Sequence, residues 1–235
     1  MRIVKNEKLI KRNALIGQYT SFGALAVLAV GMYISLKRAD LFVYALVALI
    51  LGFVMTQIGM FFSNRWGRSP RPDEQLDAAL KGLPGDTILY HYATPVAHLL
   101  VGPAGLWVLQ TYHQRGNLTY SRNRWRLSRG GFMQAYMSIF GQEGIGRPDI
   151  DIEHEIGSLK KYLAKNMPET EIPEIQSALV FTNDNLEIDA PDAPLPALKI
   201  KQLKDFLRQR AKDRAVAPLL LDKVKSILTP AEADA

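Results

Sequence analysis

The chain has 235 residues, of which 48% are hydrophobic, enough for one globular domain and an additional segment. Its formal net charge is +6, and it contains no cysteine, which excludes disulfides, cysteine nucleophiles and zinc sites with cysteine ligands. Basic residues around the apolar N-terminal region account for part of this charge, so the charge alone does not identify a nucleic-acid-binding protein.

The N-terminal region contains two long apolar stretches. No charged residue occurs between Arg12 and Lys37 or between Asp40 and Arg65. Each stretch meets the length of about 20 residues that a bilayer span needs, which predicts transmembrane helices at about 14–36 and 41–62. The alternatives are two buried core helices and a cleaved signal peptide, but core helices usually carry a polar face and signal cores are shorter.

The connection at residues 37–40 is so short that the two spans, residues 14–64, must form an antiparallel hairpin. Positive residues crowd the outer flanks of this hairpin and are fewer in its connection, which predicts a two-pass protein of the cell membrane with both termini in the cytoplasm. The basic N-terminus (1–13), a juxtamembrane linker (65–72) and the remaining chain then share the cytoplasmic side.

Small residues form one stripe along each predicted span, and they include Gly17, Gly31, Gly52 and Gly59. Such stripes allow helix backbones to approach closely in lipid. They favour close packing within the hairpin, or assembly with a second copy or a protein partner through it. The alternative explanation is that membrane helices are rich in glycine and alanine in general.

Residues 73–230 predict an α/β domain with a mixed sheet, followed by a disordered tail at 231–235. Amphipathic patterns predict helices from Asp73 to about residue 82 and at 149–165, 199–214 and 218–228. Runs of β-forming residues predict strands at 87–92, 96–101, 106–112 and 177–182, and residues 133–140 suggest a short helix within a loop. The order is therefore helix, three or more strands, helix, strand, helix.

Residues 117–127 predict a small hairpin that turns near Arg122 and Asn123. Basic and aromatic side chains interleave in this region, a pattern that grips phosphates and stacks on bases. The candidate nucleic-acid-binding residues are Arg122, Arg124, Trp125, Arg126 and Arg129. The alternative is a solvated edge strand in which arginine stacks on an aromatic ring.

Two groups of residues contain side chains that can bind metal ions. The first group is Asp149, Asp151, Glu153, His154 and Glu155. These acids open a predicted helix, where they complement its dipole, and neighbours along a helix do not converge on one ion. The second group is His91, His98 and His113, which fall on or beside neighbouring strands. Hydrogen-bonded structural histidines are the alternative to a transition-metal site there, and we predict no metal site.

The predicted helix that carries Glu74 is followed by Val96-Ala97-His98-Leu99-Leu100-Val101, a turn at 102–105 and a strand that ends in Gln110-Thr111-Tyr112. Gly116, Trp125 and Val180-Phe181 lie downstream. Residues 73–210 thereby resemble the nuclease-related domain (NERD) family of the PD-(D/E)xK nuclease superfamily. In that family the first strand carries Ile-Asp-His and the second ends in Glu-x-Lys. The resemblance implies a mixed-sheet, nuclease-like fold.

The resemblance also implies a catalytic site in which carboxylates on two adjacent strands hold Mg²⁺ or Mn²⁺ and a lysine assists the attacking water. This sequence has Ala97, Gln110 and Tyr112 at the Asp, Glu and Lys positions and keeps Glu74 and His98. One carboxylate does not replace two as the holder of a catalytic Mg²⁺. The candidate catalytic positions therefore describe a degenerate site that needs no cofactor.

We expect a membrane-anchored binding module rather than an enzyme, with nucleic acid or a protein as its ligand. One alternative is an active metal-dependent nuclease that uses Glu74 with Mg²⁺ or Mn²⁺. The other is a membrane scaffold unrelated to nucleic acid.

Overall fold

The computed structural model describes residues 1–128, 145–168, 172–213 and 216–228. The chain forms two compact units. The helical unit comprises residues 6–74, and the α/β unit comprises residues 1–5 together with the described residues from Gln75 onward. The expected short helix at 133–140 and the expected tail at 231–235 lie outside the described residues.

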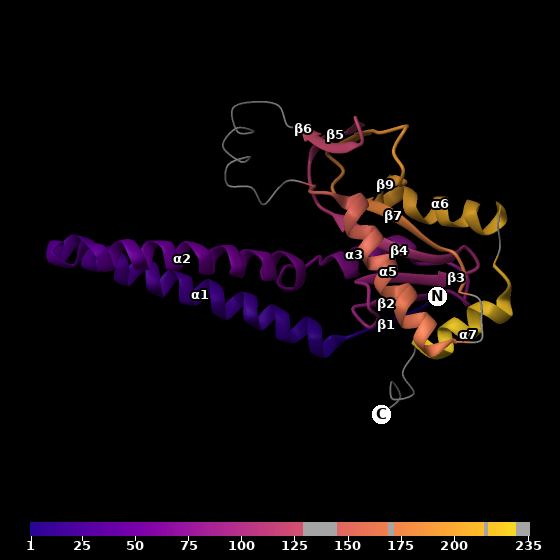
Figure 1. The fold of residues 1–235 in the computed structure, drawn as a ribbon, viewed down its shortest axis with the longest axis horizontal. Coiled ribbons are helices and arrows are strands. Elements are labelled where there is room, and N and C mark those ends of the chain that lie inside the picture. Colours follow the sequence, from indigo (N-terminus) through magenta and orange to yellow (C-terminus); the bar gives the residue numbers. More distant parts are fainter. Residues whose placement is uncertain (129–144, 169–171, 214–215, 229–235) are drawn as a thin grey trace. The chain divides into compact units, whose positions relative to one another are not determined.

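The helical unit consists of two long antiparallel helices, α1 (Glu7–Lys37) and α2 (Phe42–Phe62), joined by a 3₁₀ turn at Ala39–Leu41 (Figure 1). A π-helical turn, Ser63–Gly67, follows α2. Helix α1 begins well before residue 14 because the side chain of Asn6 caps it, accepting a hydrogen bond from the backbone N–H of Leu9 at 3.0 Å. The polar residues before the apolar stretch are therefore helical as well.

Small residues line the contact between α1 and α2, as the sequence predicts. The buried ones recur every seven residues, at Gly17, Ala24 and Gly31 in α1 and at Ala45, Gly52 and Gly59 in α2. A Cβ atom on Gly59 would lie 2.5 Å from Ser21 Oγ, and one on Gly31 would lie 2.8 Å from Ala48 Cβ. The two backbones thus approach so closely that larger residues do not fit.

The outward faces of these helices expose large apolar side chains. Phe22 and Leu25 of α1 and Val43 of α2 are each more than 60% exposed. An apolar surface of this extent is unfavourable in water. Both helices are long and apolar enough to cross a membrane, so the helical unit indicates membrane association.

The α/β unit is built on a six-stranded mixed sheet in the order β1-β2-β3-β4-β7-β9 (Figure 1). The strands are β1 (Arg2–Lys5), β2 (Ile88–His91), β3 (His98–Gly102), β4 (Gly105–Tyr112), β7 (Ile175–Phe181) and β9 (Ala197–Lys199). Strands β2, β3 and β4 form an antiparallel meander, and β1, β7 and β9 each pair in parallel with a neighbour. The strand β1 and the short strand β9 were not expected from the sequence.

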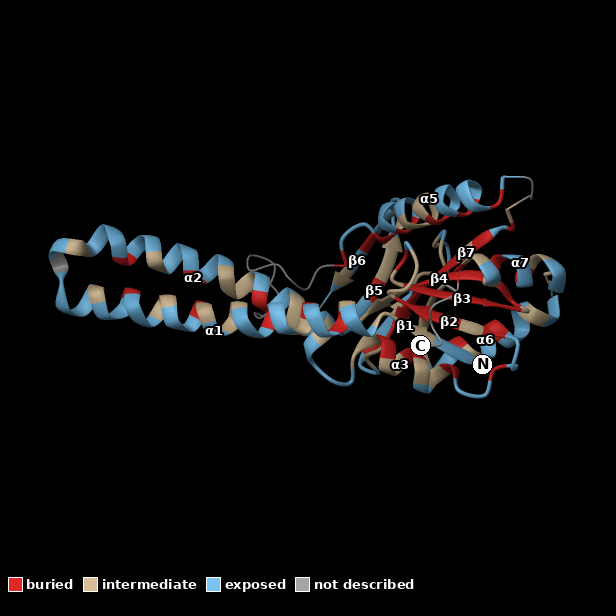
Figure 2. Cartoon of the chain, turned by 90° about the horizontal axis from the view of Figure 1, so that it is seen from below, coloured by how far each residue is buried: buried red, intermediate tan, exposed pale blue. Residues whose placement is uncertain are grey.

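Helices cover both faces of this sheet. They are α3 (Pro72–Leu80), α5 (Pro148–Asn166), α6 (Ile200–Asp213) and α7 (Pro218–Leu228). Leu106 and Val108 of β4 pack in a core with α5 and α7, whereas Trp107 and Leu109 pack in a core with α3 and α6. Figure 2 shows the buried strands between α5 on one side and α3 and α6 on the other. The expected α/β fold with a mixed sheet is confirmed.

A second, three-stranded sheet, in the order β6-β5-β8, contains β5 (Gly116–Ser121), β6 (Arg124–Ser128) and β8 (Leu186–Asp189). The predicted hairpin is formed by β5 and β6. Its turn residues Arg122 and Asn123 have φ angles of 51° and 59°, the left-handed conformation that a tight two-residue hairpin needs. Leu118 and Trp125 face a third core, which this sheet shares with α5 and β7.

Candidate functional site

The two β4 residues that the sequence nominates as degenerate catalytic positions, Gln110 and Tyr112, lie on the sheet face that α5 covers. Gln110 and Tyr112 alternate with Leu109, so they share the side of Leu106 and Val108. Leu99 pairs with Val108, and Ala97 directly precedes β3 at the end of the sheet where Gln110 follows Val108. The Oε1 atom of Gln110 is buried, and no described residue hydrogen-bonds to it. This face therefore carries a methyl group and an amide where the NERD pattern has two carboxylates.

Tyr112 stands at the position where the NERD pattern would have a lysine. Its ring stacks on Phe181 of β7, with ring centroids 5.4 Å apart and an angle of 24° between the planes. Burial raises the pKa of Tyr112, and the carboxylates of Asp151, Glu155 and Asp149 raise it further. Tyr112 is therefore a neutral, packed side chain that supplies no positive charge.

His98 lies on the opposite face of the sheet, where it meets His91 of β2. The two residues are register partners, both are buried, and their Nδ1 atoms are 2.8 Å apart. His91 Nε2 lies 3.0 Å from Asp77 Oδ1 of α3, and Asp77 Oδ2 lies 2.5 Å from the Nζ atom of Lys5 in β1. Lys5, Asp77, His91 and His98 thus form one chain of hydrogen bonds, which we call the histidine chain.

The hydrogen-bond partners in the histidine chain determine which ring nitrogen atoms carry hydrogen. A carboxylate only accepts, so the Nε2 atom of His91 carries the hydrogen that it donates to Asp77. When His91 is neutral, its Nδ1 atom then accepts the hydrogen bond from Nδ1–H of His98. Burial acts to raise the pKa of Asp77, but hydrogen bonds from His91 and Lys5 outweigh it and hold this pKa below its usual value. Asp77 is therefore a charged carboxylate between two donors.

The three histidines that suggested a transition-metal site do not come together. His91 and His98 bond to one another, since 2.8 Å between nitrogens is a hydrogen-bond distance. His113 is exposed and follows the end of β4. Within the described ranges, no group of three or more His, Asp or Glu residues is suited to hold a metal ion.

Glu74 caps the start of α3. Its Oε2 atom accepts hydrogen bonds from Ser69 Oγ at 2.7 Å and from the backbone N–H of Arg71 at 2.9 Å. Its Oε1 atom lies 3.1 Å from Nη2 of Arg71. The hydrogen bonds from Ser69 and Arg71 lower the pKa of Glu74. A glutamate in the first turn that bonds back to the N-cap N–H is one half of a capping box, so both oxygens are engaged in local structure.

In the β5–β6 hairpin the arginines are exposed to solvent, whereas the tryptophan is buried. Arg122, Arg124 and Arg126 are exposed, whereas Trp125 is only 6% exposed and its ring centroid lies 5.0 Å from that of Tyr120. Alternation along β6 puts Arg124 and Arg126 outward and Trp125 into the core, and Arg122 lies in the turn. The structure therefore brings the three arginines to one exposed hairpin and buries most of the tryptophan. Arg129 lies outside the described residues.

A hollow of about 330 Å³ lies beside this hairpin. Its lining includes Arg124, Trp125, Arg147 and Asp149. Arg147 Nη2 is 3.3 Å from Asp149 Oδ2, so the acid neutralises part of the positive charge. Asp149 and Asp151 lie in the first turn of α5, as expected for acids that complement the helix dipole.

Sequence reasoning missed Asp77 and Lys5 as partners of the histidines. One signal was present, because Asp77 lies on α3 next to Leu76 and one turn before Leu80, at the edge of the stripe that enters the core. A charge at such a position indicates a buried partner. No comparable signal marks Lys5, because Lys5 belongs to β1, and the pairing of this strand with β2 was not predicted from the sequence.

The chain matches no protein-family model, no curated protein and no solved structure. We therefore infer the function from the arrangement of the side chains. Three groups of side chains are considered: the uncharged Gln110 and Tyr112 on one face of β4, the histidine chain on the other face of the sheet, and the exposed arginines of the β5–β6 hairpin. None of these three groups combines a nucleophile, a base and an oxyanion-binding site within hydrogen-bond reach in the described part of the chain.

Proposed function

We propose that this protein is a membrane-anchored binding module whose α/β unit has a nuclease-like fold of the NERD type and binds nucleic acid without cutting it. The succession of α3, β3, β4, α5 and β7 along the chain supports the fold, because the NERD pattern has a first helix, two motif strands, a helix and an apolar strand in this order. The β2-β3-β4 meander followed by a parallel β7 gives the mixed sheet that the resemblance implies.

The observation that carries the proposal is the neutral character of the β4 face. A metal-dependent nuclease needs negative oxygen ligands for a hard cation and a positive group near the scissile phosphate. Gln110 supplies an uncharged amide, and Tyr112 supplies a protonated phenol stacked on Phe181. Glu74, the carboxylate that the sequence retains, bonds to Ser69 and Arg71.

Arg122, Arg124 and Arg126 support nucleic acid as the ligand. Exposed arginines spaced along one hairpin can contact successive phosphates, and such contacts dominate the affinity of nucleic-acid binders. The phosphate contacts position the ligand without reading its sequence, so we expect binding with little sequence preference.

The test uses the full chain in lipid nanodiscs, because β1 belongs to the sheet and a fragment that begins near residue 72 would lack it. We expect salt-dependent binding of DNA or RNA oligonucleotides and no cleavage of plasmid or oligonucleotide with Mg²⁺ or Mn²⁺. Cleavage that Glu74→Ala abolishes would show an active nuclease. Absence of binding to DNA and RNA at low salt would favour a scaffold for protein partners.

The same proposal places the protein in the cell membrane with two spans and with both termini and the α/β unit in the cytoplasm. Positive residues on the outer flanks of the hairpin support the orientation. The pairing of β1 with β2 supports a common side, because the strand before α1 and the chain after α2 share one sheet. Since the chain has no cysteine, single cysteines can report the topology.

For that measurement, Lys37→Cys marks the hairpin connection and Asp184→Cys marks the α/β unit, both at exposed positions. A membrane-impermeant maleimide should label the first in sealed cells and the second only after permeabilisation. The reverse pattern would place the α/β unit outside the cytoplasm.

A further inference from the structure

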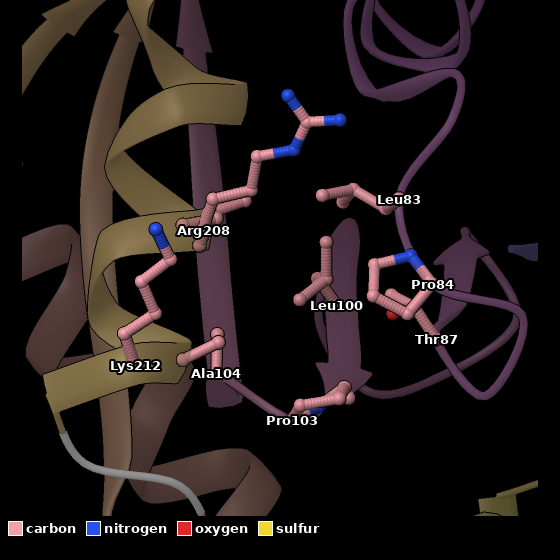
Figure 3. A pocket seen from close by; sticks show the side chains of 11 residues that line it. Leu83, Pro84, Thr87, Leu100, Pro103, Ala104, Arg208 and Lys212 are labelled. Carbon is pink, nitrogen blue, oxygen red and sulfur yellow. The ribbon is translucent and has the colours of Figure 1, made fainter.

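A pocket of about 450 Å³ opens in the α/β unit between α6 and the start of β2 (Figure 3). Its wall is mainly apolar, with Leu83, Leu100, Ala104 and Leu207 among the lining residues. The pocket is distinct from the degenerate site, because it lies at the β3–β4 turn, where β3 ends and β4 begins, whereas Gln110 and Tyr112 lie at the far end of β4. Its volume falls in the range of sites for small ligands, about 300–1,000 Å³.

The turn at residues 102–105 forms one end of this pocket. Gly102 packs against Thr87, and a Cβ atom at residue 102 would lie 2.8 Å from Thr87 Oγ1 and 3.0 Å from Thr87 Cγ2. Pro103 and Ala104 continue the wall. The carbonyl of Pro103 accepts a hydrogen bond from the backbone N–H of Val216, which ties the turn to the chain before α7. These contacts build the wall from backbone and short side chains and hold it in place.

Two cations of α6 lie at the same pocket. Arg208 and Lys212 are one helical turn apart, and Figure 3 shows both side chains rising from α6 across from Leu83 and Pro84. Both residues are exposed. Arg208 Nη2 donates to the carbonyl of Gly82 at 3.3 Å, and its Nη1 atom lies 3.6 Å from Asp205 Oδ1, which fixes the guanidinium near the rim. The pocket therefore combines an apolar interior with positive charge on one side.

We propose that this pocket binds a free, single-chain anionic amphiphile of the fatty-acid class. The hydrocarbon chain lies against Leu83, Leu100 and Leu207, where each buried methylene contributes to affinity. The carboxylate lies at the rim, where Arg208 and Lys212 donate charge-assisted hydrogen bonds to it. An uncharged ligand of the same size adds no counter-charge for Lys212 and leaves Arg208 with Asp205 alone, and a small inorganic anion leaves the apolar wall exposed to water.

The experiment uses the full chain in nanodiscs of zwitterionic lipid and a decanoate probe with a photoreactive diazirine near its terminal carbon. Mass spectrometry maps the labelled peptides. We expect labelling around Leu83, Leu100 and Leu207, together with background labelling of α1 and α2 from probe dissolved in the lipid. Labelling confined to α1 and α2 would overturn the proposal.

Charge-reversal variants distinguish labelling in the pocket from labelling by probe dissolved in the lipid, because the background from the lipid is the same for every variant. Lys212→Glu and Arg208→Glu should each reduce pocket labelling at least about tenfold, as the loss of a charged hydrogen bond predicts. Arg210→Glu is the matched control, since Arg210 lies on the same helix over the Phe206 ring and does not line the pocket. Equal labelling of all three variants would contradict the assignment, and unchanged circular dichroism and thermal unfolding verify that each variant folds.

Competition with unlabelled ligands defines the class. From hexanoate to decanoate we expect affinity to rise about fourfold per methylene, the increment for burial of one CH₂ group. Decanol should compete at least about tenfold more weakly than decanoate, because it lacks the charge. Equal competition by decanol, or none by either ligand, would overturn the proposal. Loss of labelling in nanodiscs that contain phosphatidylglycerol would identify a bilayer headgroup as the occupant instead of a free amphiphile.

Discussion

The Nδ1 atoms of His91 and His98 lie 2.8 Å apart between β2 and β3 in the interior of the α/β unit. This contact joins two strands through their side chains as well as their backbones, and Asp77 extends it to α3. Buried polar groups of this kind stabilise a fold only when each has its partner. Removal of one member should therefore have a cost beyond the lost side-chain volume.

His91→Ala should reduce the free energy of unfolding by about 2–4 kcal/mol, because it removes the donor to Asp77 and leaves a cavity beside His98. Denaturant unfolding of the full chain in nanodiscs measures the change. The matched control is His113→Ala, at an exposed position, which should alter stability by less than about 0.5 kcal/mol. Equal effects of the two variants would show that the histidine chain does not contribute.

Asp77→Asn should make stability less dependent on pH in the acid range. Hydrogen bonds from His91 and Lys5 hold the folded-state pKa of Asp77 below its unfolded value of about 3.9. The charged carboxylate thus contributes stability that is fully present above the unfolded pKa and is lost as pH falls through the folded-state pKa. The difference in unfolding free energy between wild type and variant should be about 1–3 kcal/mol at pH 7 and should narrow below about pH 4.

The outcome that would contradict this prediction is a constant difference from pH 7 down to the acid limit. Asp86→Asn, at an exposed aspartate of the same unit, serves as the control for a general effect of charge and should leave stability at pH 7 unchanged.

Gly59→Ala should destabilise the packing of α1 against α2. The new Cβ would meet the backbone of Ser21, at 3.1 Å from its nitrogen and 3.2 Å from its Cα, so a helix must move. Overpacking of this kind costs about 1–3 kcal/mol. Gly23→Ala is the control, because its Cβ would meet only the terminal methyl of Met55, which can rotate away. Thermal unfolding in nanodiscs compares the two variants. Equal unfolding temperatures would show that α1 and α2 are not closely packed at Gly59.

Glu74→Ala should lower stability by about 1 kcal/mol through loss of the cap at the start of α3. Glu74→Gln keeps an oxygen that accepts from Ser69 and from the N–H of Arg71, so most of this loss should be restored. Thermal unfolding, followed alongside oligonucleotide binding, distinguishes a structural role from a functional one. Loss of binding in Glu74→Ala with unchanged stability would show that this carboxylate acts at a ligand site.

Arg124→Ala and Arg126→Ala should each weaken oligonucleotide binding and reduce the slope of log affinity against log salt by about one. Each substitution removes one phosphate contact, so the loss should be similar for different sequences. Lys161→Ala, at an exposed position on α5, is the control for a change in net charge. An unchanged slope in the arginine variants would place the nucleic acid elsewhere.

The parts of the fold that the sequence predicts are those with local signals. The periodic pattern of 218–228 predicts α7 with its observed bounds, and the turn near Arg122 and Asn123 is found where it was expected. The seven-residue spacing of Gly52 and Gly59 predicts the helical contact surface. In each case the signal lies within a few residues of the structure that it specifies.

The missed features depend on residues far apart in the chain. Strand β1 has only four residues, and its partner β2 follows two long helices, so no local pattern reveals the pairing. The candidate residues His98 and Gln110 lie on opposite faces because Leu99 pairs with Val108, and alternation puts His98 on the other side from Leu99 and Gln110 on the same side as Val108. Trp125 points inward for the same reason of strand parity. The chemical roles proposed for these residues stay predictions.

The parallel pairing of Arg2–Lys5 with β2 also constrains how the protein is made. The ribosome synthesises β1 before both apolar helices and β2 only after them, so β1 has no partner strand until the helices have been made. An open strand edge favours unwanted pairing with other chains. The order of synthesis therefore separates the two halves of this pairing in time, and β1 must avoid pairing with other chains until β2 follows it.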